Sequence, residues 1–445
     1  MPKALELLKD YVKNGYAPDV SKYFHKIGLG FSEAQISDAI KAFNKCNLLN
    51  NYYSLTSKQV SCLKNGHLGS IIRLYGVENG LNISTKPNRL FNHIKIAPHF
   101  FKKTYEPNKY KGVQFIGLNF DTSIAIDKKS KYGKSYLGKD KFDTDIDDRC
   151  KILKESIKAA VASNSVRSQG DTVKIFMAPE FFFRGKGGSY PVHKISEIME
   201  KMRAETSKKC YENWIFVFGT AIGHLEITKR LYEVFNVALV QKGGTASSSS
   251  ENSLIVYKEK ISDLDFISGP KTLDNYSKNT GLIAPVKEHE LELCNVKVGN
   301  NSGFGTECAR SGLGGECAFV MDGISFGLEI CLDHLRARLK KSPMTKGYSN
   351  IQIHLITGYS VPFTASAVAC GKGGFIFVVD GNKGTSLCVN AGTYEKPKVT
   401  YVENNKYQKL RKPKAIDNKL LKDYTVAPDE MSINIYKTLF LPKRT

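Results

Sequence analysis

Short apolar runs and amphipathic stretches alternate along most of this 445-residue chain. From about residue 113 onward, runs rich in Val, Ile and Phe predict buried strands, and segments with apolar residues at helical spacing lie between them. Helices are expected around Ile152 to Val161 and over 192–204. Strands are expected at 114–120, 173–177, 215–220, 235–241, 253–258, 318–321, 325–330, 351–356 and 375–380. This alternation predicts an α/β fold.

The first 112 residues carry a different pattern. Apolar residues recur at helical spacing from Ala4 to Val12, and Ser32 to Gln35 match a capping box at the start of another helix. We therefore predict a small helical domain over 1–112, a main domain over 113–402 and a basic C-terminal extension over 403–445. Within the main domain, weak periodicity over 269–316 predicts a long loop.

Charge also distinguishes the first segment. The whole chain has 65 Lys and Arg against 43 Asp and Glu, a formal net charge of +22, and residues 1–112 contain 17 against 7. The order of helices in this segment could form a winged helix, so one hypothesis is a surface that binds nucleic acid. The alternative is a helical adaptor on a protein whose scattered lysines form an ordinary solvated surface.

Composition limits the class of protein. Hydrophobic residues make up 41% and charged residues 24% of the chain, and no apolar run reaches the roughly 18 to 20 residues of a membrane span. The N-terminus lacks an uninterrupted apolar segment, so we expect no secretory signal and a cytoplasmic protein; export without a leader, and hence action in another cell, stays open. The ten cysteines never form a C-x-x-C pair, so we expect mostly reduced thiols and no metal site.

Two predicted strand ends carry residues suited to nucleophilic catalysis. One apolar run ends at Cys331, and another ends just before Pro179 and Glu180. A helix expected over 333–339 would favour the Cys331 thiolate through its dipole. The three phenylalanines that follow Glu180 would desolvate this carboxyl group and raise its pKa toward that of a general base.

Five segments appear in an order that is found in a known family. They are 177–183 (Met-Ala-Pro-Glu-Phe-Phe-Phe), 257–260 (Tyr-Lys-Glu-Lys), 327–333 (Gly-Leu-Glu-Ile-Cys-Leu-Asp), 355–363 and 374–382. Together they resemble the carbon-nitrogen hydrolase superfamily of nitrilases and amidases, which places Glu, Lys and Cys in this order at strand ends. The resemblance covers roughly residues 112–401 and implies an α-β-β-α sandwich of the nitrilase type behind the small helical N-terminal domain.

The resemblance also implies roles for individual residues. Glu180 takes the proton of Cys331, whose sulfur attacks an amide or nitrile carbon. Members commonly place a lysine two residues after a Tyr, where this chain has Glu259 between Lys258 and Lys260. Lys260 is expected to stabilise the developing negative charge, because 261–266 resembles the loop after the family's lysine, and Lys258 is the reserve candidate. The backbone amide of Leu332 is the expected second donor to the oxyanion.

Further consequences follow from the same resemblance. A second glutamate, which positions the lysine or the substrate in many members, is expected at Glu307 or Glu316. The implied enzyme needs no cofactor and no metal, and acts on an amide of a small molecule or of a protein side chain through a thioester. Many members pair through the helical face near the nucleophile, so a homodimer is expected.

Other functions remain as alternatives. The chain could be a basic nucleic-acid-binding or protein-binding module with a nitrilase-like sensor or scaffold domain, or an N-acyltransferase that passes the thioester to an amine. A papain-like pair of Cys331 with His334 or His354 is weaker, because His334 lies in the next helical turn and no orienting Asn is identifiable.

Overall fold

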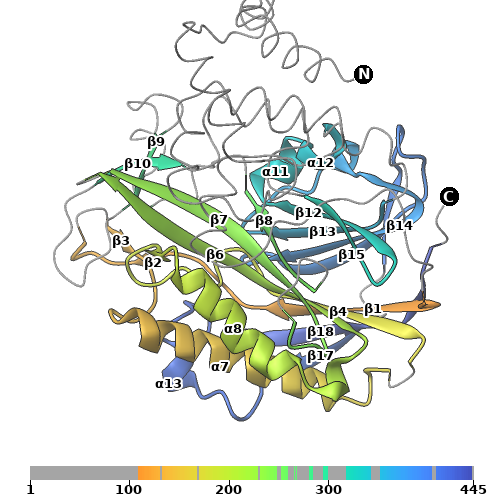
Figure 1. The fold of residues 1–445 in the computed structure, drawn as a ribbon, viewed down its shortest axis with the longest axis horizontal. Helices are drawn as coiled ribbons and strands as arrows, with labels where there is room; N and C mark the ends of the chain where they lie inside the picture. The colour runs from red at the N-terminus through yellow and green to blue at the C-terminus, as the bar shows by residue number, and fades with distance from the viewer. Residues whose placement is uncertain are drawn as a thin grey trace, which may run out of the picture.

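The computed structural model describes residues 109–130, 133–167, 170–228, 231–247, 252–258, 265, 267, 280–283, 294–298, 317–341, 351–402 and 407–442. The helical domain predicted over 1–112 lies outside the described residues except for 109–112. In the loop predicted over 269–316 the described residues are 280–283 and 294–298, which form two paired strands, so the loop prediction is wrong there. Within the described residues, two large β-sheets and a set of helices form a mixed α/β fold (Figure 1), which confirms the predicted class.

The larger sheet contains eleven of the described strands, in the order β17-β18-β1-β4-β6-β7-β10-β9, with β19 beside β1, β5 beside β6 and β8 beside β7. Strands β1, β4 and β6 are parallel, whereas β7 is antiparallel to β6 and β8 is antiparallel to β7. The bounds are β1 Gly112–Asn119, β4 Thr172–Met177, β5 Tyr190–Pro191, β6 Trp214–Thr228, β7 Leu231–Lys242, β8 Ser253–Tyr257, β9 Thr280–Ile283, β10 Cys294–Val298, β17 Tyr407–Arg411, β18 Ser432–Tyr436 and β19 Leu439–Phe440.

The smaller sheet has six described strands in sequence order from β11 to β16. Its central strands β12, β13 and β14 are parallel, and antiparallel strands flank them. The bounds are β11 Ala318–Met321, β12 Ile324–Ile330, β13 Ile351–Gly358, β14 Cys370–Asp380, β15 Gly384–Asn390 and β16 Val399–Tyr401. A separate short hairpin joins β2 (Ala125–Ile126) to β3 (Lys134–Ser135).

The two sheets pack face to face through a continuous apolar core. Successive side chains of a strand point to opposite faces, so Phe115 of β1 lies in this inner core whereas Ile116 belongs to the core on the outer face. The Phe115 ring contacts Phe375 and Phe377 of β14, with ring centroids 5.5 Å and 5.1 Å away. Both faces of β1 are therefore buried, which accounts for its nearly unbroken apolar sequence.

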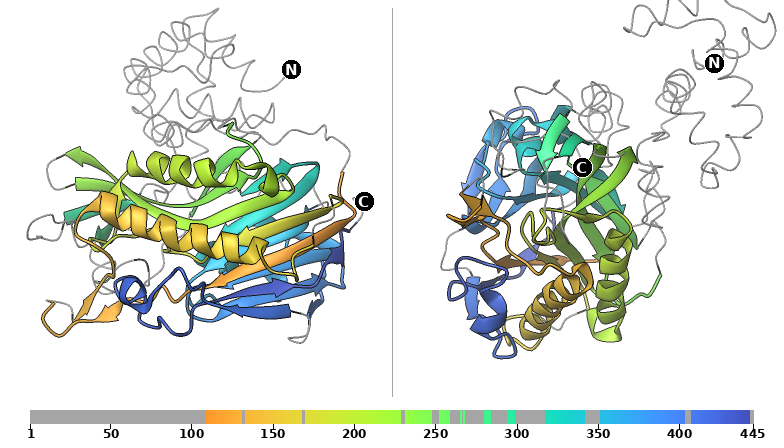
Figure 2. Two further views of the ribbon diagram at one scale, coloured as in Figure 1. Left: turned by 90° about the horizontal axis from the view of Figure 1, so that it is seen from below. Right: turned by 90° about the vertical axis from the view of Figure 1, so that its left-hand side faces the viewer.

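Two long helices, α7 (Phe142–Val161) and α8 (Lys194–Thr206), lie side by side on the outer face of the larger sheet (Figure 2). Each buries one apolar stripe against the sheet, including Ile152 of α7 and Ile198 of α8. On the smaller sheet, α11 (Leu332–Leu335) and α12 (Arg338–Lys341) contact β12. The remaining short helices are η2 Lys209–Tyr211, η3 Ala365–Ala367 and α13 Asn418–Leu421.

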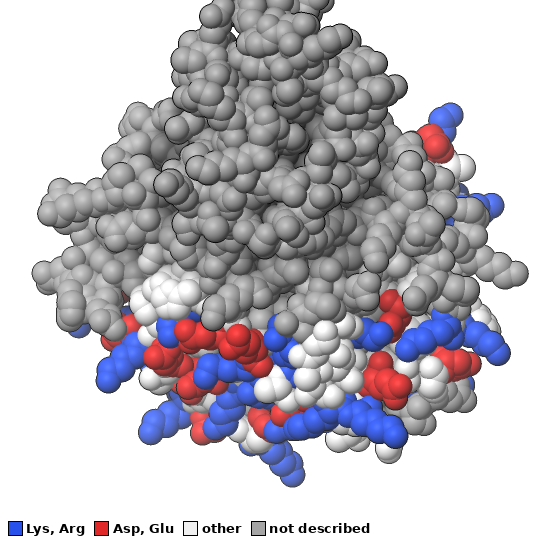
Figure 3. Space-filling model, viewed as in Figure 1, with Lys and Arg blue, Asp and Glu red and all other residues white. Residues whose placement is uncertain are grey.

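The exposed side of α7 and α8 carries both signs of charge. Figure 3 shows Lys and Arg interspersed with Asp and Glu on the described part of this face. Two ion pairs of 2.7 Å join the helices, from Lys194 to Asp143 and from Lys201 to Asp147. Such exposed pairs contribute little stability, and the mixture of charges is typical of an ordinary solvated surface.

The residues after 402, which the sequence suggests as a basic extension, supply three strands to the larger sheet. Strand β18 pairs antiparallel with β1, β17 pairs with β18, and β19 pairs with the start of β1. No helix in the described residues is long and apolar enough to cross a membrane.

Candidate active site

One edge of the sandwich collects the candidate catalytic residues because of strand direction. Strand β8 runs in the same sense as β4, since two antiparallel pairings and one parallel pairing separate them. The carboxyl ends of β4 and β8 therefore lie at the same edge, where Glu180 follows β4 by three residues and Lys258 follows β8 directly. Cys331 directly follows β12 of the smaller sheet.

Glu180 is completely buried and bound on one side only. Its Oε1 accepts hydrogen bonds from Lys258 Nζ and from Asn236 Nδ2, both at 2.9 Å. Its Oε2 has no hydrogen-bond partner among the described residues. The carboxyl group thus keeps one oxygen free for a proton or a ligand.

The backbone around Glu180 is held by the neighbouring strand β6. Phe181 adopts a left-handed conformation with φ of 63°, and its amide donates a 2.8 Å hydrogen bond to Thr220 Oγ1. Gly219 has φ of +77°, and a Cβ there would lie 2.4 Å from the Pro179 carbonyl oxygen. A side chain at Gly219 would displace the turn that carries Glu180, so only glycine fits here.

Cys331 sits at a sharp turn between β12 and α11. Its φ is +50° and ψ is −110°, an unusual conformation for a residue with a side chain. The Cys331 amide donates a 2.9 Å hydrogen bond to the Thr357 carbonyl, and the thiol approaches the Tyr359 carbonyl oxygen at 3.7 Å. The predicted helix over 333–339 is in fact two four-residue helices, interrupted at Ala337, which has φ of +52°.

Burial dominates the protonation states of this site. Burial and the charge of Glu180 raise the pKa of the Cys331 thiol, and Lys258 only partly offsets this rise. This raised pKa favours a neutral thiol at rest, in the opposite direction to the helix-dipole effect expected from the sequence. Burial raises the pKa of Glu180 to about 7, against the opposing effect of Lys258. A carboxyl group with this pKa can accept a proton near neutral pH, as the three phenylalanines led us to expect.

The structure places Lys258 beside Glu180. Burial by itself would lower the pKa of Lys258, but the carboxylates of Asp265 and Glu180 raise it above the ordinary value, so the side chain is an ammonium ion. Lys258 Nζ also donates a short hydrogen bond to the Asp265 carboxylate. The first candidate from the sequence, Lys260, lies outside the described residues.

Two polar residues of the site were missed in the sequence. Asp265 binds Lys258, whereas the candidates Glu307 and Glu316 lie outside the described residues. The available signal was its position seven residues after Lys258, in the stretch that resembles the loop after the family's lysine. Asn236 on β7 was also missed, although a polar residue inside an apolar strand is a recognisable signal.

A second buried cluster lies next to the Cys331 turn. Both His334 Nδ1 and His354 Nε2 lie 2.9 Å from Glu329 Oε2. The other ring nitrogens accept hydrogen bonds from the backbone amides of Thr364 and Ala369. Every ring nitrogen is thus used within the protein, which does not fit a metal site, and neither histidine pairs with the cysteine as a papain-like arrangement requires.

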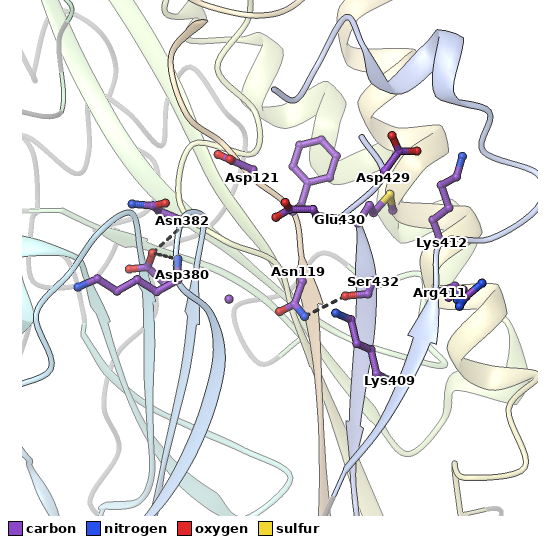
Figure 4. Close-up of a pocket in the computed structure, with 15 residues that line it drawn as sticks. Asn119, Asp121, Asp380, Asn382, Lys409, Arg411, Lys412, Asp429, Glu430 and Ser432 are labelled. Atoms are coloured by element: carbon purple, nitrogen blue, oxygen red, sulfur yellow. Dashed lines mark hydrogen bonds between the residues drawn. The ribbon is translucent and has the colours of Figure 1, made fainter. Parts of the chain in front are cut away.

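A cavity of about 860 Å³ opens between the β14–β15 turn and the ends of β1 and β18 (Figure 4). Acidic and basic side chains both line it, among them Asp121, Glu430 and Arg411. Asp380 at its wall accepts hydrogen bonds from the amides after Tyr359, so it organises the turn whose carbonyl contacts the thiol. Glu180, Lys258 and Cys331 do not line this cavity.

Comparisons with known proteins give the following matches. No protein-family model and no curated protein matches this sequence. Among solved structures, an amidase from Nesterenkonia sp. is similar with a TM-score of 0.30 and 8% identity, over 68% of this chain and 94% of that chain. Saccharomyces cerevisiae Nit3, a member of branch 10 of the nitrilase superfamily, is similar with a TM-score of 0.31 and 10% identity, over 68% and 94%.

A mutant of the same Nesterenkonia amidase is also similar, with a TM-score of 0.30 and 8% identity, over 68% of this chain and 94% of that chain. That structure shows covalent addition of the acetamide moiety of fluoroacetamide at the active-site cysteine of that enzyme. The Nesterenkonia amidase and Nit3 are both members of the nitrilase superfamily.

Proposed function

We propose that this protein is a cysteine-dependent hydrolase of a carbon-nitrogen bond, with an amide as substrate and an α-β-β-α sandwich of the nitrilase type as its fold. The observation that carries this proposal is the buried contact of 2.9 Å between Glu180 and Lys258 at the edge where Cys331 directly follows β12. It supports a triad of Glu180, Lys258 and Cys331. The order of the three motifs in the sequence supports the same assignment.

The proposed reaction begins with the neutral thiol. Glu180 accepts the Cys331 proton as the sulfur attacks the carbonyl carbon, because a thiol with a raised pKa does not ionise beforehand. The carbonyl oxygen becomes an oxyanion, which the Lys258 ammonium and the Leu332 amide stabilise. Glu180 then returns the proton to the nitrogen, the carbon-nitrogen bond breaks, and ammonia or an amine leaves a thioester on Cys331.

The second half restores the enzyme. Glu180 takes a proton from water, whose oxygen attacks the thioester carbon. The carbon-sulfur bond then breaks, the proton passes to the sulfur, and the carboxylic acid is released. An amine in place of water would give the N-acyltransferase, so both reactions share the first half.

A substrate panel tests this function. Primary amides, nitriles and peptides with Gln or Asn are incubated with the full chain, and ammonia release is measured together with the intact mass of the protein. We expect ammonia from amides and, under rapid quenching, an acyl adduct on Cys331. Added hydroxylamine distinguishes acyl transfer, because it would be converted to a hydroxamate.

Variants connect turnover to the proposed residues. Cys331→Ala removes the nucleophile, and Glu180→Gln keeps the shape of the side chain but cannot accept the proton, which should cost about 10²- to 10⁴-fold in rate. Cys388→Ala is the matched control, because it removes another buried thiol away from this edge. Full activity in Cys331→Ala would refute the proposal.

A further inference from the structure

A buried arginine lies beside the proposed site. Arg184 follows Glu180 by four residues, and only 5% of its surface is exposed. Its Nη2 donates a short hydrogen bond to the backbone carbonyl of Asp265, the residue whose carboxylate binds Lys258. Asp265 thus connects Arg184 to Lys258, the cation that would bind the oxyanion.

Two aromatic rings fix the plane of this guanidinium group. Its carbon Cζ lies 4.1 Å from the Phe181 ring centroid and 4.3 Å from that of Tyr136. Lys258 Nζ lies 5.6 Å from the same Phe181 ring, so Arg184 and Lys258 share this wall. Stacking covers the faces of the guanidinium group, but its N–H donors lie in the plane and need partners of their own.

Most of those donors have no partner among the residues that the structure describes. Neither Nε nor Nη1 of Arg184 makes a hydrogen bond to any described residue, although both atoms are buried. These two atoms carry three of the five N–H donors of a guanidinium group. No ion pair to a described carboxylate joins Arg184 either.

A neighbouring arginine shows how this protein satisfies a structural guanidinium group. Arg149 of α7 is also buried, but its Nε binds the Asp145 carboxylate at 2.8 Å and its other nitrogens donate to the carbonyls of Phe182 and Leu137. All three nitrogen atoms of Arg149 are therefore used inside the protein. Because a buried charge without a counter-ion is unfavourable, the contrast indicates that an external anion completes Arg184.

We propose that Arg184 binds a carboxylate of the substrate, so that this enzyme acts on amides that also carry a carboxylate group. The inference rests on the proposed function and adds the class of substrate to it. Lys258 is already neutralised by Glu180 and Asp265, whereas no carboxylate in the described part of the chain pairs with Arg184, so a substrate anion would bind at Arg184. The amide carbonyl would then lie at Lys258 and Cys331, with the carboxylate a few bonds further along the molecule.

Matched pairs of substrates test this inference. The monoamides of malonic, succinic and glutaric acid are compared with their methyl esters, which have the same amide but no charge. We expect a higher kcat/KM for the acids, with one chain length preferred because both anchoring points are fixed. Loss of a buried ion-pair partner should lower the ratio of kcat/KM between acid and ester by about 30-fold or more in Arg184→Met.

Arg184→Met keeps an unbranched side chain between the two rings, and Arg184→Lys keeps the charge. Arg167→Met is the matched control, because it removes an exposed arginine near the amino end of β4, away from the site. If wild-type protein hydrolyses the amide equally well in the acids and in their methyl esters, the inference is overturned, whether or not the variants fold. An unchanged acid preference in folded Arg184→Met would overturn it as well.

A second measurement separates this inference from the proposed function. Alkylation of Cys331 by iodoacetamide is followed by peptide mass in the presence of succinate or glutarate, without any turnover. We expect one of these dicarboxylates to protect Cys331 in wild type and in Arg167→Met but not in Arg184→Met. Protection without hydrolysis of any amide would refute the function and keep the anion site, whereas hydrolysis without protection or acid preference would refute the anion site alone.

Discussion

Replacing Lys258 with Met tests which lysine acts in catalysis. Met preserves much of the length of the side chain and removes its charge, so the carboxyl groups of Glu180 and Asp265 remain buried without the cation that binds both. Breaking a buried ion pair costs about 3 to 5 kcal/mol of stability, and losing one oxyanion donor costs about 10²- to 10³-fold in kcat.

The same substitution changes the base. Lys258 lowers the pKa of Glu180, which burial raises to about 7, so its removal should raise that pKa further. Each further unit lowers the ionised fraction at neutral pH by up to about tenfold. We therefore expect the loss of kcat in Lys258→Met to exceed the loss caused by removing an oxyanion donor alone. Part of this kcat should return as the pH rises.

Ammonia release across a pH series measures the catalytic loss, and urea unfolding measures the free energy of unfolding. Lys260→Met is the matched variant, because it removes the same charge two residues away and should keep a rate close to that of wild type. If Lys260→Met loses activity while Lys258→Met keeps it, the catalytic lysine is Lys260 and the assignment from the Glu180 contact is wrong.

Three further predictions concern pH and backbone geometry. The kcat/KM should fall below about pH 7, because the base Glu180 must be ionised and its pKa is raised to about 7; an acid limb at the ordinary carboxyl pKa would contradict this. Burial would raise the pKa of Glu329, but hydrogen bonds from two histidines lower it to about 2. At a pH above the ordinary carboxyl pKa, ionised Glu329 should therefore add about 3 kcal/mol to the free energy of unfolding. That contribution is lost as pH falls toward about 2, and Glu329→Gln should flatten this loss in urea unfolding; an equally steep loss would refute it. Gly219→Ala should cost about 1 to 3 kcal/mol of stability and lower kcat. Gly133→Ala is the control, because Gly133 has a φ of +67° but no atom within 4 Å of an added Cβ, so this variant should change only the stability. An equal kcat in the two variants would exclude displacement of the Glu180 turn.

The sequence predicted the two strand ends that carry Glu180 and Cys331 because each is an apolar run with a polar stop. The structure has those strands as β4 and β12, with bounds within one residue of the predicted ones. Hydrophobic periodicity reports which face of a strand is buried, and both strands are buried on two faces, so the signal was strong.

Hydrophobic periodicity could not distinguish Lys258 from Lys260. Residues two apart in a strand point to the same face, so period-two patterns treat them alike, and only the end of β8 at Tyr257 distinguishes them. Asp265 lies in a stretch without periodicity, and its role depends on a contact with Lys258 that spacing does not encode.

The strands near the C-terminus were missed for a different reason. β17 contains Gln408, Lys409 and Arg411 and reads as a polar tail, because an edge strand can expose one face to water. The neighbouring β18 is completely buried, but it is only five residues long and two of its residues, Ser432 and Asn434, are polar. The pattern of apolar residues over these two short strands was therefore too weak to predict them from the sequence.

The pairing of β18 with β1 has a consequence for biosynthesis. Gln114 of β1 donates a hydrogen bond to the Tyr436 carbonyl, 322 positions later in the chain. During translation β1 leaves the ribosome long before its partner, so its edge stays open to other strands until the last part of the chain emerges. This long-range pairing predicts slow folding, and a chain that ends before β18 is expected to be prone to aggregation.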